Sequence, residues 1–237
     1  MYYLVVIFGL IYGYLSGSVS YARLFARIGK NVDITKVGNG NPGTSNVSRE
    51  IGTGWGLLTL LCDALKGSVV MAAFKLLFFS ADPVYAVALP FEGAGFPALV
   101  LIGIAAILGH AFPVYYKFHG GGSIGVLFGC WLYLILPQFL ICTALSYFIV
   151  KLFFPKQKYP MGRMTPVVFC VLTPIYLLAE TLIASARTPL FPDSLLFDHW
   201  AWGQHSVMLI VSIVIFTLTV IPINLRLLTT EVLKKKA

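Results

Sequence analysis

The amino-acid sequence predicts an all-α polytopic membrane protein with seven transmembrane helices, its N-terminus outside and its C-terminus in the cytoplasm. Hydrophobic residues make up 58% of the 237 residues and charged residues only 11%, whereas soluble domains carry about twice that charged fraction. Apolar runs recur from one end of the chain to the other, and helices satisfy the backbone of such runs inside a bilayer. We therefore expect residues 1–237 to form a single membrane domain.

The apolar runs give the expected helices in chain order. They lie at residues 2–26, 55–79, 96–115, 123–136, 138–154, 165–184 and 205–222. A crossing needs about 20 residues, and the fourth and fifth runs together hold only about 32. These two runs form either two short helices that turn near Pro137 or one long bent helix.

The positions of the basic residues decide between these alternatives. Lysine and arginine are enriched in the cytoplasmic loops of membrane proteins, and here they gather in residues 23–49, 151–163 and 226–236. Seven crossings place all three segments on the cytoplasmic side, whereas one long bent helix would break that pattern. The net charge of +8 accordingly indicates orientation and contact with membrane lipid, and no segment resembles a nucleic-acid-binding module.

The polar stretch between the first two runs is the leading candidate for a binding site. Its glycines allow sharp turns in which successive N–H groups form an anion-binding nest. Neutral donors and the forked cation of Arg49 add further groups that suit phosphate. The candidate substrate-binding residues here are Asn39, Gly40, Asn41, Gly43, Thr44, Ser45 and Asn46. The alternative interpretation is a solvated connector.

A second glycine-rich segment directly precedes the fourth run. Gly120, Gly121, Gly122 and Ser123 form a plausible anion cradle at the positive end of a helix dipole. His110, near the end of the third run, is either an acid or base of the site or a helix cap. With seven crossings, this segment and the polar stretch lie near the same membrane face.

Two ionisable residues lie inside the second run. Asp63 and Lys66 are three residues apart, so they can neutralise each other on one helix face. Ionisable groups within a span are costly and usually face the bundle interior. The pair is either a structural ion pair or a supporting group that orients the first loop. Arg226, after the last run, has the position of a cation that anchors a cytoplasmic helix end.

Glycine and cysteine patterns indicate packing. Glycines recur every four residues on the first run and near the fourth, a spacing that permits close helix approach: Gly9, Gly13 and Gly17, then Gly121, Gly125 and Gly129. The four cysteines lie in apolar runs without C-x-x-C spacing, so we expect buried thiols and neither a disulfide nor a metal.

Several common catalytic motifs are missing from the sequence. It contains no H-x-x-x-x-D pair for a histidine-activated acyltransferase, no Walker A loop and no histidine cluster with metal-ligand spacing. Chemistry at the candidate site would therefore depend on positioning and charge stabilisation.

Four motifs together resemble a known family. Residues 37–52 read V-G-N-G-N-P-G-T-S-N-V-S-R-E-I-G, residues 63–67 read D-A-L-K-G, residues 109–121 read G-H-A-F-P-V-Y-Y-K-F-H-G-G, and residues 224–228 read N-L-R-L-L. The chain resembles the bacterial membrane acyl-phosphate:glycerol-3-phosphate acyltransferases, the PlsY family, over nearly its whole length. This resemblance implies seven crossings in the bacterial inner membrane, with the signature loops on the cytoplasmic face.

The resemblance also implies a reaction and roles for site residues. An acyl group would move from acyl phosphate to the hydroxyl at position one of glycerol 3-phosphate, giving lysophosphatidate and phosphate without a cofactor. Arg49 would be a main phosphate clamp, and Asn224 would close the site from the tail. The residues lining the polar site would be Asn41, Gly43, Thr44, Ser45 and Asn46, and those of the acyl-phosphate site Gly120 and Gly121.

The chain departs from the family pattern at positions that carry charge. His119 and Gly122 stand where lysines are expected, and Ile221 stands where a histidine is expected. Thr35 replaces an arginine, Asn39 a serine and Ser123 a glycine. Loss of one charge that stabilises the transition state costs about 10²- to 10³-fold in rate. Two alternatives to an active acyltransferase therefore stay open: an impaired paralogue that binds a phospho-ligand or lipid as a sensor or subunit, and a small anion or solute transporter.

Overall fold

The computed structural model describes residues 2–75, 95–153, 164–185 and 207–236, and their regular structure is entirely helical. In chain order the helices are α1 (Tyr2–Ser18), α2 (Tyr21–Lys30), α3 (Thr44–Glu50), α4 (Thr53–Phe74), α6 (Gly95–Ala111), the 3₁₀ turn η2 (Val114–Tyr116), α7 (Ile124–Leu134), α8 (Leu136–Phe153), α9 (Met164–Ser185) and α10 (Val207–Lys236). The all-helical membrane class predicted from composition is confirmed.

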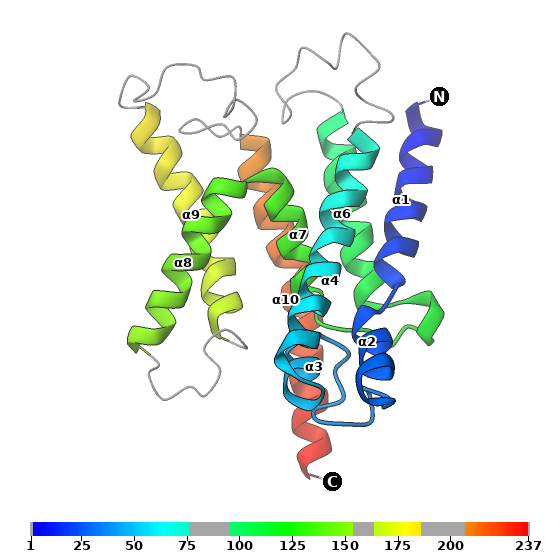
Figure 1. Ribbon diagram of the computed structural model, residues 1–237. Helices are drawn as coiled ribbons and strands as arrows, with labels where there is room; N and C mark the ends of the chain where they lie inside the picture. The colour runs from blue at the N-terminus through cyan, green and yellow to red at the C-terminus, as the bar shows by residue number, and fades with distance from the viewer. Residues whose placement is uncertain (1, 76–94, 154–163, 186–206, 237) are drawn as a thin grey trace.

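Five helical segments of the described chain are long and apolar enough to cross a membrane. They are Tyr3–Lys30, Thr53–Phe74, Pro97–Tyr116, Leu136–Phe153 and Leu209–Leu227, and shorter apolar helices lie at Ile124–Leu134 and Thr165–Ala179. The start of α1 and the end of α10 lie at opposite ends of the molecule (Figure 1). The count of seven crossings and the orientation of the termini stay predictions.

The fourth and fifth apolar runs form two helices, as the charge pattern predicted. Helix α7 ends at Leu134, and Ile135 breaks the helical path with φ −142° and ψ 48°. Pro137 is the second residue of α8, where its missing N–H has no helical partner to lose. Helix α8 then packs against α9 (Figure 1).

The structure divides the predicted first helix into α1 and α2, with a break at Val19 and Ser20. The ammonium of Lys66 donates hydrogen bonds to the carbonyl oxygens of Gly17 at 3.1 Å and Val19 at 2.7 Å. These bonds satisfy carbonyl groups that would otherwise be left unpaired where the helix opens. Helix α2 ends at Lys30 and is capped by Asn31, whose left-handed conformation (φ 51°) is one that asparagine tolerates well.

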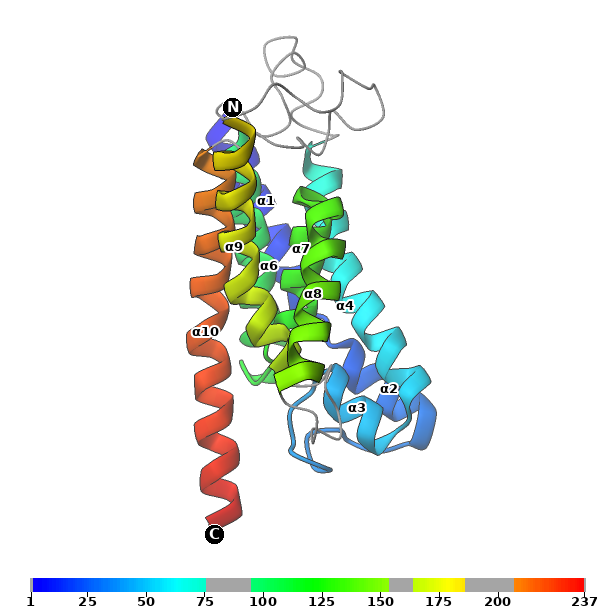
Figure 2. The same ribbon diagram turned by 90° about the vertical axis from the view of Figure 1, so that its left-hand side faces the viewer.

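The prediction that the last helix ends at Pro222 is wrong. Helix α10 continues through Pro222 to Lys236 and runs along the full height of the molecule (Figure 2). A proline removes one helical hydrogen bond, and membrane helices tolerate that loss when neighbouring groups compensate. Asn224 and Arg226 consequently lie within α10 and not beyond it.

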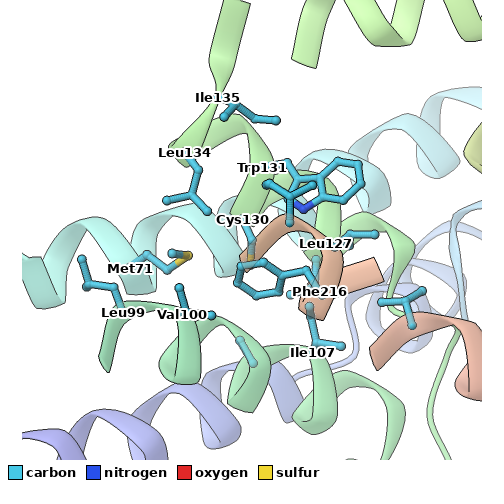
Figure 3. Close-up of a cluster of buried hydrophobic side chains, with 14 of the residues drawn as sticks. Met71, Leu99, Val100, Ile107, Leu127, Cys130, Trp131, Leu134, Ile135 and Phe216 are labelled. Atoms are coloured by element: carbon cyan, nitrogen blue, oxygen red, sulfur yellow. The ribbon is translucent and has the colours of Figure 1, made fainter. Parts of the chain in front are cut away.

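The main core lies between α4, α6, α7 and α10. Buried side chains from these helices meet in one cluster (Figure 3), which includes Met71, Leu99, Val100, Ile107, Leu127, Cys130, Trp131 and Phe216. Trp131 and Phe216 are fully buried, so this cluster fixes the relative positions of α7 and α10.

The first glycine ladder packs α1 against α6, as predicted. A Cβ atom on Gly13 would lie 2.8 Å from the carbonyl oxygen of Ile102, and one on Gly17 would collide with the backbone of Ala106. Such backbone atoms cannot move aside without shifting a helix.

We expect Gly17→Ala to destabilise the fold by about 1–3 kcal/mol, because overpacking forces two helices apart. Unfolding in detergent, followed by circular dichroism, measures this cost. Leu15→Ala, at an exposed position of the same helix, is the matched control and should change stability far less. Equal stability of the Gly17→Ala variant and the parent would contradict the close packing of α1 on α6.

Candidate active site

The polar stretch between α2 and α4 is held in shape by Asn46. This side chain is 1% exposed, and its amide nitrogen donates to the carbonyl oxygens of Ile34 at 3.1 Å and Val37 at 3.0 Å. Its amide oxygen accepts a hydrogen bond from the backbone N–H of Asn39 at 3.2 Å. Asn46, predicted to line the site, therefore uses its side chain to hold residues 34–39 against α3.

Two turns give the stretch its curvature. Gly38 and Gly40 have φ angles of 59° and 73°, which glycine adopts without strain. Before them, Thr35 donates its hydroxyl to the carboxylate of Asp33 at 2.7 Å. This hydrogen bond, joined by one from the Thr35 backbone N–H at 3.0 Å, lowers the pKa of Asp33 below its ordinary value. The threonine that replaces the family arginine thus stabilises the start of the stretch.

Asn41 carries an unused polar atom. Its backbone N–H donates to the side-chain oxygen of Asn39 at 3.1 Å, whereas its own side-chain oxygen is buried and has no hydrogen-bond partner among the described residues. A buried acceptor without a partner costs free energy. A hydroxyl or N–H group of a ligand could satisfy it.

The next predicted residues lie on α3, which forms a short helix where the sequence indicated only a loop. Gly43 is extended (φ −143°) and precedes Thr44, the first residue of α3. Thr44 and Ser45 are partly buried, whereas Arg49 is exposed. Arg49 makes no hydrogen bond or ion pair within the described part of the chain, so its role as a phosphate clamp stays a prediction.

Asp63, Lys66 and His110 form a buried cluster beside this stretch. Asp63 is 2% exposed, Lys66 5% and His110 6%. The Lys66 ammonium lies 2.9 Å from the Asp63 carboxylate and 2.8 Å from Nδ1 of His110. Its three protons go to His110 and to the carbonyl oxygens of Gly17 and Val19 at the break between α1 and α2, and Asp63 balances the charge. The short contact between Lys66 and Asp63 fits the interpretation as a structural ion pair, whereas a role of the pair in orienting the first loop stays a prediction.

The cluster also sets the orientation of the His110 ring. A charged lysine can only donate, so Nδ1 of His110 accepts and the neutral ring carries its proton on Nε2. Nε2 faces the glycine segment, because a Cβ atom on Gly121 would lie 2.5 Å from it. The backbone N–H of Gly121 in turn donates to the His110 carbonyl oxygen at 3.1 Å. His110 thus presents a fixed N–H donor to residues 120–122.

The glycine segment contacts the polar stretch on one side and α10 on the other. A Cβ atom on Gly121 would lie 2.9 Å from the carbonyl oxygen of Pro42. Asn224 of α10 donates to the Gly122 carbonyl oxygen at 2.9 Å and to the Val220 carbonyl oxygen at 2.9 Å. The structure therefore brings together three motifs that are far apart in the sequence.

Ser123 uses its side chain for packing. It is 1% exposed, its φ of 61° is left-handed, and its hydroxyl donates to the carbonyl oxygen of Ile107 at 2.9 Å. The hydroxyl is therefore turned toward α6. The resemblance placed a glycine at this position, which fits the left-handed backbone.

Two arginines that the sequence did not indicate as site residues also contact this region. Arg23 of α2 donates to the carbonyl oxygen of His119 at 2.9 Å and stacks over the Tyr116 ring at 4.5 Å. Arg226 of α10 lies 4.6 Å from the Phe112 ring centre and 3.5 Å from the Ala111 carbonyl oxygen. Both flank the segment between α6 and the glycines. In the sequence, the only feature that could have indicated these two arginines was a positive charge near the end of a predicted helix.

The chain is similar in sequence to known proteins. The glycerol-3-phosphate acyltransferase family matches residues 7–229. Proteins named glycerol-3-phosphate acyltransferase are similar in sequence: one from Mycoplasma pneumoniae is 38% identical over 142 residues, covering 60% of this chain and 59% of the relative, and one from Bartonella quintana is 34% identical over 164 residues, covering 69% of each. For a relative from Mycoplasma mycoides, 34% identical over 149 residues, the match covers 63% of this chain and 54% of the relative.

Solved structures show the same fold. The crystal structure of PlsY, described as an integral membrane glycerol 3-phosphate acyltransferase in its glycerol 3-phosphate form, superposes with a TM-score of 0.65 at 22% identity, covering 95% of this chain and 92% of that one. The lysophosphatidic acid form of the same protein gives a TM-score of 0.64. With the family match spanning nearly all of its length, the chain belongs to the glycerol-3-phosphate acyltransferase family.

Proposed function

We propose that this protein transfers a fatty acyl group from acyl phosphate to the hydroxyl at position one of glycerol 3-phosphate, producing lysophosphatidate and inorganic phosphate. The observation that carries this proposal is that the Gly120–Gly122 segment contacts two distant parts of the chain. Gly121 lies against Pro42 of the Asn39–Asn46 stretch, and Gly122 accepts a hydrogen bond from Asn224. Backbone donors in glycine-rich turns suit phosphate, and family membership supplies the reaction class.

The reaction is a direct substitution at the acyl carbon. The substrate hydroxyl oxygen forms a bond to that carbon, the bond from the carbon to the phosphate oxygen breaks, and the phosphate leaves with the electron pair. The hydroxyl proton passes to the departing phosphate. No covalent enzyme intermediate is required, so the protein acts by positioning both substrates and stabilising charge.

The described residues suggest a division of labour. The unpartnered side-chain oxygen of Asn41 is suited to accept the proton of the attacking hydroxyl as a hydrogen bond and so to orient it. The Nε2 proton of His110, beside Gly121, is suited to donate to a phosphate oxygen. Asn224 holds the glycine segment through the Gly122 carbonyl oxygen. Arg49 is the cation predicted to clamp a substrate phosphate.

The orientation of the site follows the same proposal. Helices α2 and α3 and the last turns of α10 lie at one end of the molecule (Figure 2), and the first of the three basic segments falls there. Enrichment of lysine and arginine on the cytoplasmic side supports a protein of the bacterial inner membrane with seven crossings and a cytoplasmic active face.

An impaired paralogue that binds a phospho-ligand is the alternative function. The observation that favours it is the replacement of two expected lysines by His119 and Gly122 and of a histidine by Ile221. Ile221 lies on α10 and is 46% exposed. Because isoleucine has no imidazole, the ring that the family pattern expects three residues before Asn224 is missing.

Acyl transfer by the Arg49→Ala variant separates the two functions. We expect the purified parent to form labelled lysophosphatidate from palmitoyl phosphate and labelled glycerol 3-phosphate, and the variant to be about 10²- to 10³-fold slower. Because the Arg49 side chain is exposed and makes no hydrogen bond or ion pair with the described residues, its removal should leave the melting temperature unchanged. Lys36→Ala removes another exposed cation between α2 and α4. It is the matched control and should leave the rate of acyl transfer unchanged. A folded parent without product, beside an active family member in the same lipid, would favour the impaired paralogue.

A further inference from the structure

The glycine segment has no cation of its own. Residues 118–123 read F-H-G-G-G-S, and the buried Lys66 directs its three protons to His110, Gly17 and Val19. A reaction between two phosphate-bearing substrates concentrates negative charge, which requires positive charge close to the phosphates. That charge has to come from a side chain outside residues 118–123.

Arg23 is placed to do so from another element. It lies on α2, yet its Nη2 atom donates to the carbonyl oxygen of His119, the residue directly before Gly120, at 2.9 Å. Its guanidinium carbon lies 4.5 Å from the centre of the Tyr116 ring. The planar group is therefore fixed between the ring and the glycine segment, a position that a flexible surface arginine does not keep.

The guanidinium of Arg23 has unused capacity. Its Nε atom is buried and lacks a hydrogen-bond partner among the described residues. No carboxylate of the described residues forms an ion pair with the Arg23 guanidinium. A buried donor attached to a cation is costly when it is left unpaired. A phosphate oxygen would supply both the missing acceptor and the missing negative charge, and arginine suits phosphate because it can donate two parallel hydrogen bonds.

We propose that Arg23 is a phosphate-binding residue of this site and that it supplies the positive charge that the glycine segment lacks. The proposal rests on the proposed function for the identity of its ligand. The shared chemistry is a phosphate monoester or acyl phosphate, and either substrate can provide it. The competing explanation is that Arg23 only ties α2 to His119 as a structural strap.

Steady-state kinetics of Arg23→Gln and Arg23→Lys test the proposal. Glutamine retains a donor but loses the charge, whereas lysine retains the charge without the fork. We expect Arg23→Gln to raise the KM for one substrate at least about tenfold, Arg23→Lys to do so less, and the melting temperature without ligand to change little. A higher KM for palmitoyl phosphate would place Arg23 at the acyl-phosphate group. A higher KM for glycerol 3-phosphate would place Arg23 at the phosphate of the acceptor.

Two further variants sharpen the test. Arg27→Gln removes an exposed cation one turn further along α2 and should leave both KM values unchanged. The double variant Arg23→Gln/His119→Lys places a cation on the exposed residue next to Gly120, and it should recover part of the lost affinity. Recovery by a charge at a second position is not expected of a structural strap.

Direct binding keeps this test independent of turnover. Calorimetric titration of the parent and of Arg23→Gln with glycerol 3-phosphate, and with inorganic phosphate, measures the contribution of Arg23 even if the protein proves inactive. We expect weaker binding by Arg23→Gln for at least one of these ligands or for palmitoyl phosphate. A lower melting temperature with unchanged affinities and unchanged KM values would show a strap only and would overturn the proposal.

Discussion

Lys66→Met is expected to destabilise the protein by about 3–5 kcal/mol, because it leaves the buried carboxylate of Asp63 without a counter-charge. Asp63 is 2% exposed, and the Lys66 ammonium lies 2.9 Å from it. Methionine has a similar length, so loss of volume does not dominate the effect. The substitution also removes the hydrogen-bond donor to the carbonyl oxygens of Gly17 and Val19. The break between α1 and α2 then loses the hydrogen bonds from α4. Unfolding in detergent measures the change in free energy.

Removing both charges provides the matched control. In the double variant Asp63→Asn/Lys66→Met no buried charge remains, so we expect it to be more stable than Lys66→Met alone, although the carbonyl groups at the end of α1 stay unpaired. If the double variant is as unstable as Lys66→Met, the loss of stability comes mainly from the missing hydrogen bonds to Gly17 and Val19 and not from the unpaired charge of Asp63. A loss below about 1 kcal/mol for Lys66→Met, the range of an exposed pair, would contradict burial of the cluster.

Gly121→Ala is expected to lower acyl transfer by about 10²-fold, since small displacements of positioning groups have effects of that size. The added Cβ would lie 2.5 Å from Nε2 of His110 and 2.9 Å from the Pro42 carbonyl oxygen. The ring and the polar stretch must both move away from the glycine segment. We expect only a small change in melting temperature, because Gly121, His110 and Pro42 are not members of the main hydrophobic cluster.

Gly54→Ala is the control for this prediction. A Cβ on Gly54 meets nothing within 4 Å, and its position in the first turn of α4 favours alanine over glycine. We expect parental activity and equal or slightly higher stability. Full activity of Gly121→Ala would mean that the polar stretch and the glycine segment do not form one site.

The helices and the convergence of the motifs could be predicted from the sequence. The length of an apolar run limits where a crossing begins and ends, and the positions of lysine and arginine assigned the polar stretch, the glycine segment and the tail to one face. The structure indeed brings Pro42, Gly121, Gly122 and Asn224 together. The separation of α7 from α8 at Ile135 followed from the same charge pattern.

Contacts between distant residues could not be predicted in this way. The bonds from Lys66 to Gly17 and Val19 join residues 49 and 47 positions apart, and the bond from Arg23 to His119 spans 96 positions. No local pattern marks them. The break in the first helix depends on Lys66 of another helix, so hydrophobic periodicity alone indicated a continuous helix.

Side-chain roles within the polar stretch show a related limit. Donors and acceptors in such a stretch are chemically similar, so the sequence could not distinguish ligands from supports. The structure assigns Asn46 to the carbonyl oxygens of Ile34 and Val37, whereas Asn41 keeps an unpartnered buried oxygen. The continuation of α10 past Pro222 depends likewise on tertiary packing, which a local rule for proline does not contain.

The most direct test of the central claim is the stoichiometry of the reaction catalysed by the purified protein in lipid. With palmitoyl phosphate and glycerol 3-phosphate, our account predicts lysophosphatidate and inorganic phosphate in equal amounts, and no product when a palmitoyl thioester replaces palmitoyl phosphate. Phosphate release without lysophosphatidate, transfer from the thioester alone, or binding without turnover by the folded protein would contradict it.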